Sequence, residues 1–284
     1  MRYVFALGGN AFGKKNIDIA AGAIVRIWKE GNEVLVTHGN GPQVGALYLR
    51  EGKNLAILTR ETEHELGCSI RKALLRRRAD TKVDVFITKV LVDGKDPEFL
   101  RPTKPIGEFY SREEDVPKGK RNFAVRKLGK GYRLVVPSPV PMDIIGTEKI
   151  DRMLSEGKIV IAAGGGGEAV IRSYGRLRPA DAVIDKDFAS ALLARKMGAD
   201  RLFILTDVDG AYVHFGTRRQ KLLLKTNVSR MRDYLGEGQF EEGSMMPKVK
   251  ACIEFVESTG GIAAIGNIAR IGDVVRLKST VVLP

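Results

Sequence analysis

Short apolar runs alternate with longer amphipathic segments along most of the chain. The apolar runs have the length of buried β-strands and lie at residues 3–7, 34–37, 83–92, 159–163, 202–205 and 280–283. Apolar residues recur at helical spacing in residues 17–29, 42–50, 61–78, 148–156, 186–197 and 244–258. Strands that alternate with helices are typical of a parallel sheet covered by helices. The pattern therefore predicts an α/β fold with such a sheet at its centre.

Residues 93–133 interrupt this alternation. Pro97, Pro102, Pro105 and Pro117 break any regular period there, and charged residues are dense. An insertion of this kind is usually a surface loop, a small subdomain or a lid over a site. We therefore expect this stretch to lie outside the main sheet.

The composition indicates a globular protein of a reducing compartment. Of the 284 residues, 44% are hydrophobic, which is ample for a core, and no apolar run approaches the ~18 residues of a membrane span. Cys68 and Cys252 are isolated from each other and from any metal-binding motif. The first predicted strand begins within three residues of Met1, which leaves no room for a signal peptide. We expect a cytoplasmic protein that does not bind a membrane.

The formal net charge of +13 allows two interpretations. A basic chain can bind nucleic acid, and the best candidate patch is Arg71 and Lys72 with residues 76–78. The charge can instead form solvated helix faces and an electropositive cleft that attracts phosphorylated ligands. No aromatic residue is interleaved with the basic cluster, and no nucleic-acid motif is present. We therefore expect phosphorylated small molecules as ligands and no nucleic acid.

Glycine-rich turns follow four of the apolar runs. They are residues 6–11 (ALGGNA), 38–45 (HGNGPQVG), 164–167 (GGGG) and 206–210 (TDVDG). In an open α/β sheet, ligands bind beyond the carboxyl ends of the strands, where glycine lets backbone N–H groups approach an anion. Each turn alone also suits an ordinary strand-to-helix connection, and His38 suits a structural role as well as a catalytic one. Four such turns at one sheet edge favour a long polyanionic ligand, such as a nucleotide phosphate tail meeting an acceptor.

Two lysines lie where predicted helices begin. Lys186 stands between Asp185 and Asp187, a triplet that also suits a capped, solvated helix start. Lys248 follows Ser244 in the first turn of a later helix, where the positive end of the helix dipole disfavours a cation unless an anion is bound. We interpret the two lysines as cations that stabilise a transferred phosphoryl group, with Asp187 holding them in place.

Eight segments, taken in order, resemble the carbamate kinases, a family within the amino-acid kinase superfamily. They are ALGGNA (6–11), THGNGPQVG (37–45), DPEF with PTKPIGEFY (96–99 and 102–110), GYRLVVPSP (131–139), AAGGGG (162–167), AVIDKD (182–187), ILTDVDGAYV (204–213) and GQFEEGSMMPKV (238–249). The resemblance covers nearly the whole chain. It implies an open three-layer αβα sandwich around a mostly parallel sheet of about eight strands, with residues 93–133 as a small protruding subdomain.

The resemblance also implies an activity. One domain, residues 1–284, would hold the acceptor in an N-terminal lobe (1–157) and ATP in a C-terminal lobe (158–284). The reaction would be reversible phosphoryl transfer between ATP and carbamate, giving ADP and carbamoyl phosphate. Mg²⁺ would be carried by the nucleotide, with no direct metal motif in the chain, and the protein would be a homodimer.

Site residues follow from the matching motifs. Catalysis would rest on Lys186, Asp187 and Lys248; the acceptor would lie against Gly8, Gly9, Asn10, Gly39, Asn40 and Gly41; the nucleotide would lie against Gly164, Gly165, Asp207, Ser244 and Met245.

The chain departs from the family pattern mainly around the acceptor. A family lysine that reaches the acceptor from the subdomain falls on Val125, which leaves Arg126 or Lys127 to replace it. After the four glycines, residues 168–169 read Glu-Ala in place of an apolar residue and proline, and residues 63–68 read EHELGC in place of the family's Gln-Gly…Ile-Gly-Tyr. Two alternatives stay open: a related kinase for another small carboxylate, and a non-catalytic nucleotide-binding regulator.

Overall fold

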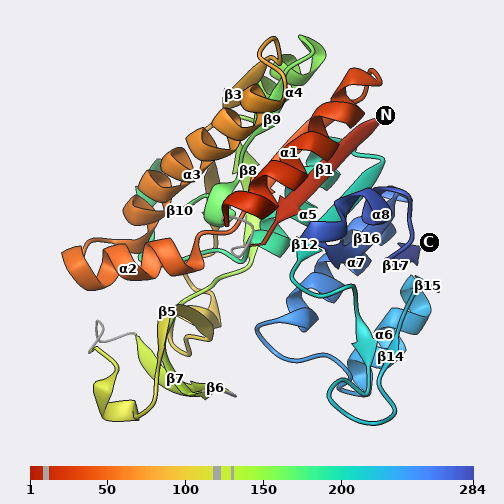
Figure 1. Ribbon diagram of the computed structural model, residues 1–284. Helices are drawn as coiled ribbons and strands as arrows, with labels where there is room; N and C mark the ends of the chain where they lie inside the picture. Colours follow the sequence, from red (N-terminus) through yellow and green to blue (C-terminus); the bar gives the residue numbers. More distant parts are fainter. Residues whose placement is uncertain (9–12, 118–122, 129–130) are drawn as a thin grey trace.

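The centre of the protein is an eight-stranded sheet (Figure 1). The computed structural model describes residues 1–8, 13–117, 123–128 and 131–284. The strands of this sheet are β1 (Arg2–Leu7), β2 (Glu33–His38), β3 (Val83–Val85), β9 (Ile159–Ile161), β12 (Arg201–Thr206), β15 (Lys225–Asn227), β16 (Ile262–Asn267) and β17 (Thr280–Leu283). Their order is β15–β17–β16–β12–β1–β2–β9–β3, and only the β16–β17 pair among them is antiparallel. The predicted mostly parallel sheet of about eight strands is confirmed.

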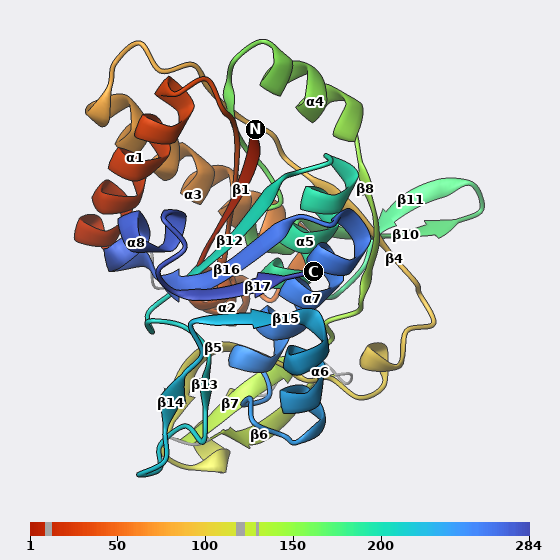
Figure 2. The same ribbon diagram turned by 90° about the vertical axis from the view of Figure 1, so that its right-hand side faces the viewer.

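Helices cover both faces of the sheet (Figure 2). One face carries α1 (Lys14–Lys29), α3 (Leu55–Arg77) and α8 (Ile271–Val275), and the other carries α4 (Thr147–Ser155), α5 (Lys186–Lys196), α6 (Val228–Gly236) and α7 (Met245–Thr259). Alternate residues of each strand supply the two cores. In β1, Phe5 and Leu7 pack with α1 and α3, whereas Val4 and Ala6 pack with α5 and α7. The three-layer αβα arrangement is therefore confirmed.

Aromatic side chains stabilise the middle of the sheet. Phe5 of β1 and Phe203 of β12 stack with ring centroids 5.0 Å apart, and Tyr3 stacks on Phe203 at 5.8 Å. Full burial of a side chain of this size contributes about 1.5–3 kcal/mol. These contacts fix the pairing of the two strands whose carboxyl ends meet at the functional site.

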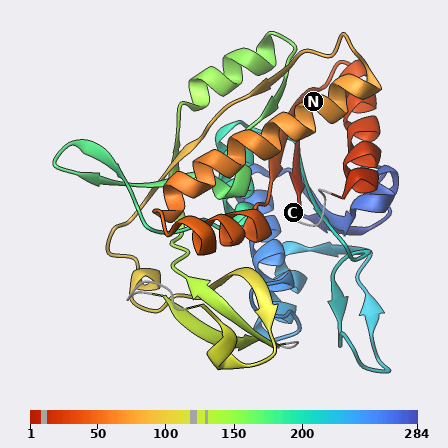
Figure 3. The same ribbon diagram turned by 60° about the vertical axis from the view of Figure 1, so that its left-hand side comes forward.

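The insertion forms a separate three-stranded antiparallel sheet below α2 (Gly41–Glu51), as Figures 1 and 3 show. Its strands are β5 (Lys104–Tyr110), β6 (Ala124–Leu128) and β7 (Gly131–Val136), in the order β5–β7–β6, with short 3₁₀ helices η2 (Pro97–Phe99) and η3 (Glu113–Asp115). Val44 and Tyr48 of α2 pack with Ile106 and Leu134 of this sheet in a third apolar cluster. We call this part the subdomain.

A third sheet corrects one prediction. The order β11 (Arg176–Pro179), β10 (Glu168–Ser173), β4 (Lys89–Val92), β8 (Pro141–Ile145) forms a four-stranded sheet whose β10–β11 hairpin projects from the body (Figure 2). The single strand expected over residues 83–92 is wrong, because β3 and β4 belong to different sheets. The chain turns away at Thr88, whose backbone N–H donates to the buried carboxyl group of Glu63. A short hairpin, β13 (Tyr212–Val213) with β14 (Lys221–Leu222), completes the strands.

The contact between α2 and the subdomain gives a first prediction. A Cβ on Gly45 would lie 2.1 Å from the backbone nitrogen of Gly107 in β5. Gly45→Ala should therefore lower the free energy of unfolding by about 1–3 kcal/mol, because the backbone must move to admit the methyl group. Gly22→Ala in α1 is the matched control: its Cβ would meet only the Arg77 side chain, at 3.8 Å. That variant should gain about 0.5–1 kcal/mol from helix propensity. Urea unfolding measures the free energy of unfolding of both variants. A value for Gly45→Ala equal to that of the wild type would contradict the close contact between α2 and β5.

Candidate functional site

A cavity of about 330 Å³ lies beyond the carboxyl ends of β1 and β12. The strand order reverses between these strands, since β2 follows on one side of β1 and β12 lies on the other. Such a reversal is where open α/β sheets bind ligands. Gly8 lines the cavity, and its backbone N–H donates to the Leu205 carbonyl at 2.9 Å, which joins the two strand ends.

Three helices begin at this cavity. Gly41 at the start of α2, Lys186 at the start of α5 and Ser244 just before α7 all line it. A helix N-terminus carries a partial positive charge and unpaired N–H groups, so each of these ends favours an anion. The arrangement fits a ligand with several negative charges.

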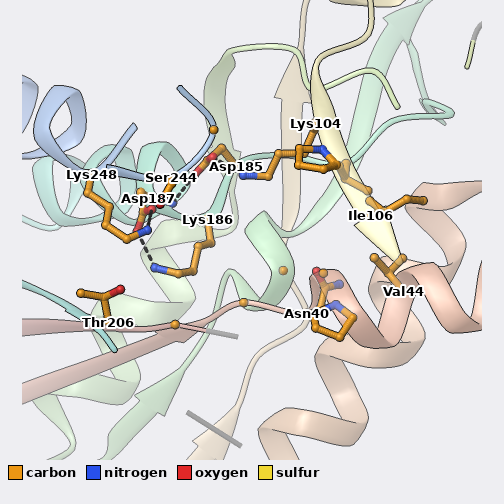
Figure 4. A pocket seen from close by; sticks show the side chains of 18 of the residues that line it. Asn40, Val44, Lys104, Ile106, Asp185, Lys186, Asp187, Thr206, Ser244 and Lys248 are labelled. Carbon is orange, nitrogen blue, oxygen red and sulfur yellow. Dashed lines mark hydrogen bonds and ion pairs between the residues drawn. The ribbon is translucent and has the colours of Figure 1, made fainter. Parts of the chain in front are cut away.

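Two lysines flank one buried carboxylate at the centre of the cavity (Figure 4). Asp187, whose side chain is 3% exposed, pairs through Oδ1 with Lys186 Nζ and through Oδ2 with Lys248 Nζ at 2.9 Å. With both lysines protonated, the triad has a net charge of +1. Lys186, Asp187 and Lys248 therefore lie together as the sequence predicted, and they face the space that an anion would fill.

The charges of the triad depend on one another. Burial raises the pKa of Asp187, but the two ammonium groups outweigh it and hold that pKa well below the usual range. Burial lowers the pKa of Lys186, and Lys248 adds to this effect against the attraction of Asp187. Burial also lowers the pKa of Lys248, but Asp187 and the neighbouring carboxylates outweigh it and the net shift is upward.

Asp185 connects two parts of the site. One of its carboxylate oxygens accepts the backbone N–H of Asp187 at 2.8 Å and caps α5. The other accepts the Nζ of Lys104, the first residue of β5 in the subdomain. Lys104 lines the cavity, so the subdomain supplies a cation directly beside the triad.

The turn after β2 forms the opposite wall. Gly39, Asn40 and Gly41 line the cavity, and the side-chain amide of Asn40 donates to Thr62 Oγ1 of α3 at 2.8 Å. Gly165 of the 3₁₀ helix η4 (Gly164–Gly166) lies against Asn40, since a Cβ on it would be 2.2 Å from the amide nitrogen. The predicted contributors Gly9 and Asn10 lie outside the described residues.

Gly164 has a different position from the one predicted. It does not line the cavity; its backbone N–H donates to Glu63 at 3.0 Å, and a Cβ there would lie 2.3 Å from the His38 ring. His38 is buried below the turn, with Nδ1 3.2 Å from the Gly39 carbonyl. Burial lowers the pKa of His38 to about 4, so the ring is neutral at pH 7. Both residues are therefore placed for packing under the turn.

The subdomain presents different cations from those expected. Arg126 and Lys127 are exposed on β6 and do not line the cavity. Arg133 of β7 does line it, together with Lys104. The guanidinium of Arg133 donates to the Gly107 carbonyl at 2.6 Å and stacks on Phe109 at 4.8 Å. Its Nε is buried with no hydrogen-bond partner among the described residues, and burial lowers its pKa.

A second hollow of about 90 Å³ adjoins the first. The two share Thr206, Asp207, Ser244 and Lys248. The remaining walls are largely apolar and include Val208, Tyr212, Phe215, Phe240 and Met245. An apolar hollow joined to a cationic cavity fits a ligand with a flat ring at one end and phosphates at the other. Asp207 and Ser244 line both cavities, and Met245 lines the apolar hollow.

The basic cluster on α3 is largely occupied by contacts within the protein. Arg76 pairs with Asp18 at 2.8 Å, Arg78 pairs with Asp80 at 2.7 Å, and Arg71 donates to the Val83 carbonyl. These contacts favour the structural interpretation of the cluster. In the part of the chain that the structure describes, no helix has the length and apolar character needed to cross a membrane.

Comparisons with known proteins show what the whole chain is similar to. The family model described as "Amino acid kinase family" matches residues 1–267. The chain is 40% identical to the carbamate kinase-like protein YqeA of Escherichia coli over 93% of this chain and 92% of that protein. It is 40% identical to a carbamate kinase of Trichomonas vaginalis over 93% of both chains. The structure of Giardia lamblia carbamate kinase bound to AMP-PNP superposes with a TM-score of 0.87 at 33% identity, covering 99% of this chain and 98% of that one.

The buried triad gives a second prediction. Asp187→Asn should lower the free energy of unfolding by about 3–5 kcal/mol, because two cations remain in a buried site without their carboxylate. Asp143→Asn removes the partner of Lys196 at the surface and should cost at most about 1 kcal/mol. Equal losses in the two variants would contradict the role given to Asp187.

The difference in the free energy of unfolding between the wild type and Asp187→Asn should depend on pH in a definite direction. The pKa of Asp187 is lower in the folded protein than its ordinary value of 3.8. The stabilisation should therefore be complete above about pH 5 and decrease as the pH falls further, because the unfolded chain then takes up a proton at this position while the folded carboxylate stays ionised. Urea unfolding of wild type and Asp187→Asn between pH 3 and pH 7 measures this.

Proposed function

The chain belongs to the amino acid kinase family, and we propose that within it the protein is a carbamate kinase, which transfers a phosphoryl group reversibly between ATP and carbamate. The observation that carries the proposal is the pair Lys186 and Lys248 around Asp187, at the junction of a cationic cavity and an apolar hollow. Carbamate kinases from several organisms are among the relatives at about 40% identity.

The residues have distinct parts in this reaction. In the direction of carbamoyl phosphate, a carbamate oxygen attacks the γ-phosphorus of ATP, and the bond to the β–γ bridging oxygen breaks to release ADP. Negative charge spreads over the equatorial oxygens of the moving group. Lys186 and Lys248 stabilise that charge from fixed positions, which requires no covalent intermediate with the protein.

The acceptor lies between the subdomain and the turn after β2. Its negative charge faces Arg133 and Lys104, and the turn at Gly39, Asn40 and Gly41 closes the other side. The alternatives of a different acceptor and of a non-catalytic regulator are motivated by the departures around the acceptor, among them the family lysine that falls on Val125. Lys104 and Arg133 place two subdomain cations at the cavity, which supports a working acceptor site.

Magnesium, in this proposal, enters with the nucleotide. Within the described residues, no group of three or more His, Cys, Asp or Glu side chains could hold a metal by itself. Mg²⁺ commonly binds through one or two carboxylates together with substrate phosphates. Asp207, which lines both cavities, is the carboxylate that fits this role. The ion supplies further positive charge to the phosphates.

We further propose a cytoplasmic homodimer. The support for the dimer is the family resemblance. Cys68 and Cys252 are both free thiols, which supports a reducing compartment.

The proposed reaction is tested most directly by ATP formation. Purified protein with ADP, Mg²⁺ and carbamoyl phosphate should produce ATP. Lys186→Ala and Lys248→Ala should each lower kcat by at least ~10², the scale for losing one electrostatic donor to the transition state. Lys196→Ala, at the far end of α5, is the matched lysine control and should keep the wild-type rate. Absence of ATP from protein that still binds ADP would overturn the proposed acceptor.

A second set of variants separates the subdomain cations. Arg133→Ala and Lys104→Ala should each lower kcat/KM for carbamoyl phosphate by about 10- to 100-fold, the cost of losing a hydrogen bond to a charged group. Arg126→Ala and Lys127→Ala should leave it within about twofold, because both side chains are exposed on β6. A large loss in either of these two variants would mean that the acceptor contacts β6 instead.

A further inference from the structure

Glu63 of α3 is a buried carboxyl group that lies beneath one wall of the cavity. We call this wall, formed by residues 39–41 and Gly165 of η4, the acceptor wall. Glu63 is 1% exposed. Its Oε1 accepts the backbone N–H of Gly164 at 3.0 Å and of Thr88 at 3.3 Å, and the Thr88 N–H also lies 3.2 Å from Oε2. One side chain thus holds both the link between β3 and β4 and the start of η4.

The preceding residue holds the other half of the wall. Thr62 accepts the amide of Asn40, and Asn40 is packed against Gly165 of η4. Consecutive residues of α3 therefore fix the two turns that meet at the acceptor side of the cavity. A small displacement of Glu63 would be transmitted to Asn40 and Gly165, which both line the cavity.

A second buried carboxyl group lies next to the first. Glu168, directly after the four glycines, is 2% exposed, and its negative charge acts on Glu63. Its Oε2 is buried with no hydrogen-bond partner among the described residues. The cation facing it is Arg60, whose guanidinium is 49% exposed and 4.0 Å from Oε1. An exposed arginine at that distance does not neutralise two buried acids.

The other titratable group near Glu63 does not neutralise these two buried acids either. His38 of β2 faces Glu63 from the other side, but its ring is neutral at pH 7. Burial, with a smaller contribution from the charge of Glu168, raises the pKa of Glu63 to about 8 against the opposing effect of the backbone N–H groups of Thr88 and Gly164. Burial and the neighbouring acid both favour the protonated form of Glu63.

We propose that Glu63 is a positioning residue that acts as a neutral acid, and that loss of its proton loosens the acceptor wall. The effect on catalysis rests on the proposed function. As a neutral acid, Glu63 accepts the two backbone N–H groups through Oε1 and carries its proton on Oε2. When the proton leaves, two negative charges face each other in the interior.

A glutamine at position 63 distinguishes the effect of the proton from the effect of the side chain's size and shape. Glu63→Gln keeps the accepting oxygen and replaces the O–H by an N–H₂ donor that does not titrate in this pH range. Glu63→Ala removes the support altogether. Glu65→Gln on the exposed side of α3 is the matched control for charge.

The first measurement is ATP formation as a function of pH. The KM of the wild type for carbamoyl phosphate should rise about tenfold per pH unit above pH 8, while the KM for ADP stays constant. Glu63→Gln should keep a constant KM for carbamoyl phosphate from pH 6.5 to 9.5, Glu63→Ala should show a raised KM throughout, and Glu65→Gln should follow the wild type. Parallel profiles of the wild type and Glu63→Gln would overturn the proposal.

The second measurement is urea unfolding, which does not depend on the reaction. A pKa raised from 4.5 to about 8 means that the folded protein binds one more proton than the unfolded chain between these values. Wild-type stability should therefore fall relative to Glu63→Gln as the pH rises, by about tenfold in the unfolding equilibrium constant per pH unit. The ratio should change about 100-fold between pH 5.5 and pH 7.5.

The two measurements distinguish failure of the proposal on Glu63 from failure of the proposed function. A pH-independent ratio would show that Glu63 is already ionised and would overturn the proposal, whatever the activity. If the wild type forms no ATP at any pH, the proposed function fails, while the unfolding comparison still decides whether Glu63 keeps its proton.

Discussion

The single buried carboxylate of Asp187 forms ion pairs with two ammonium groups, and the rest of the site depends on this excess of one positive charge. Without Asp187, Lys186 and Lys248 would repel each other in a poorly solvated space and would tend to lose their protons. With it, both keep fixed positions, and one positive charge is left over. In the proposed reaction, the transferred phosphoryl group would compensate that charge, so the excess positive charge that attracts the ligand would also stabilise the negative charge that develops during transfer.

The parallel sheet determines where this charge is placed. β1 and β12 end side by side, and the connections that follow the strands approach this edge, so the ends of α2, α5 and α7 converge there. The subdomain adds the two cations that the main sheet does not supply, Lys104 and Arg133. Contacts between α2 and β5 hold it in place, with glycines at the closest approach.

Much of this arrangement could be predicted from the sequence, because it follows from local patterns. Apolar runs located most central strands, and helix-start chemistry located Lys186 and Lys248. What could not be predicted depends on contacts between distant segments. Lys104 stands in the quoted PTKPIG motif, but its approach to the site needs the antiparallel pairing of β5 with β7 and the partner Asp185.

Contacts between distant segments also explain why the predictions for residues 83–92 and for Gly164 were wrong. The apolar run of residues 83–92 has no internal break signal; it divides because Glu63, on a helix earlier in the chain, binds the backbone at Thr88. Gly164 looks like a phosphate-binding glycine, yet its lack of a side chain is required by the His38 ring behind it. Asp185 has a wider consequence, since one of its oxygens caps the helix that carries Lys186 and the other holds the subdomain through Lys104. In the proposed reaction, the acceptor would lie beside Lys104 and the transferred phosphate beside Lys186, so both ligands would act on this one carboxylate. The factor by which the nucleotide changes the affinity for the acceptor would then equal the factor by which the acceptor changes the affinity for the nucleotide.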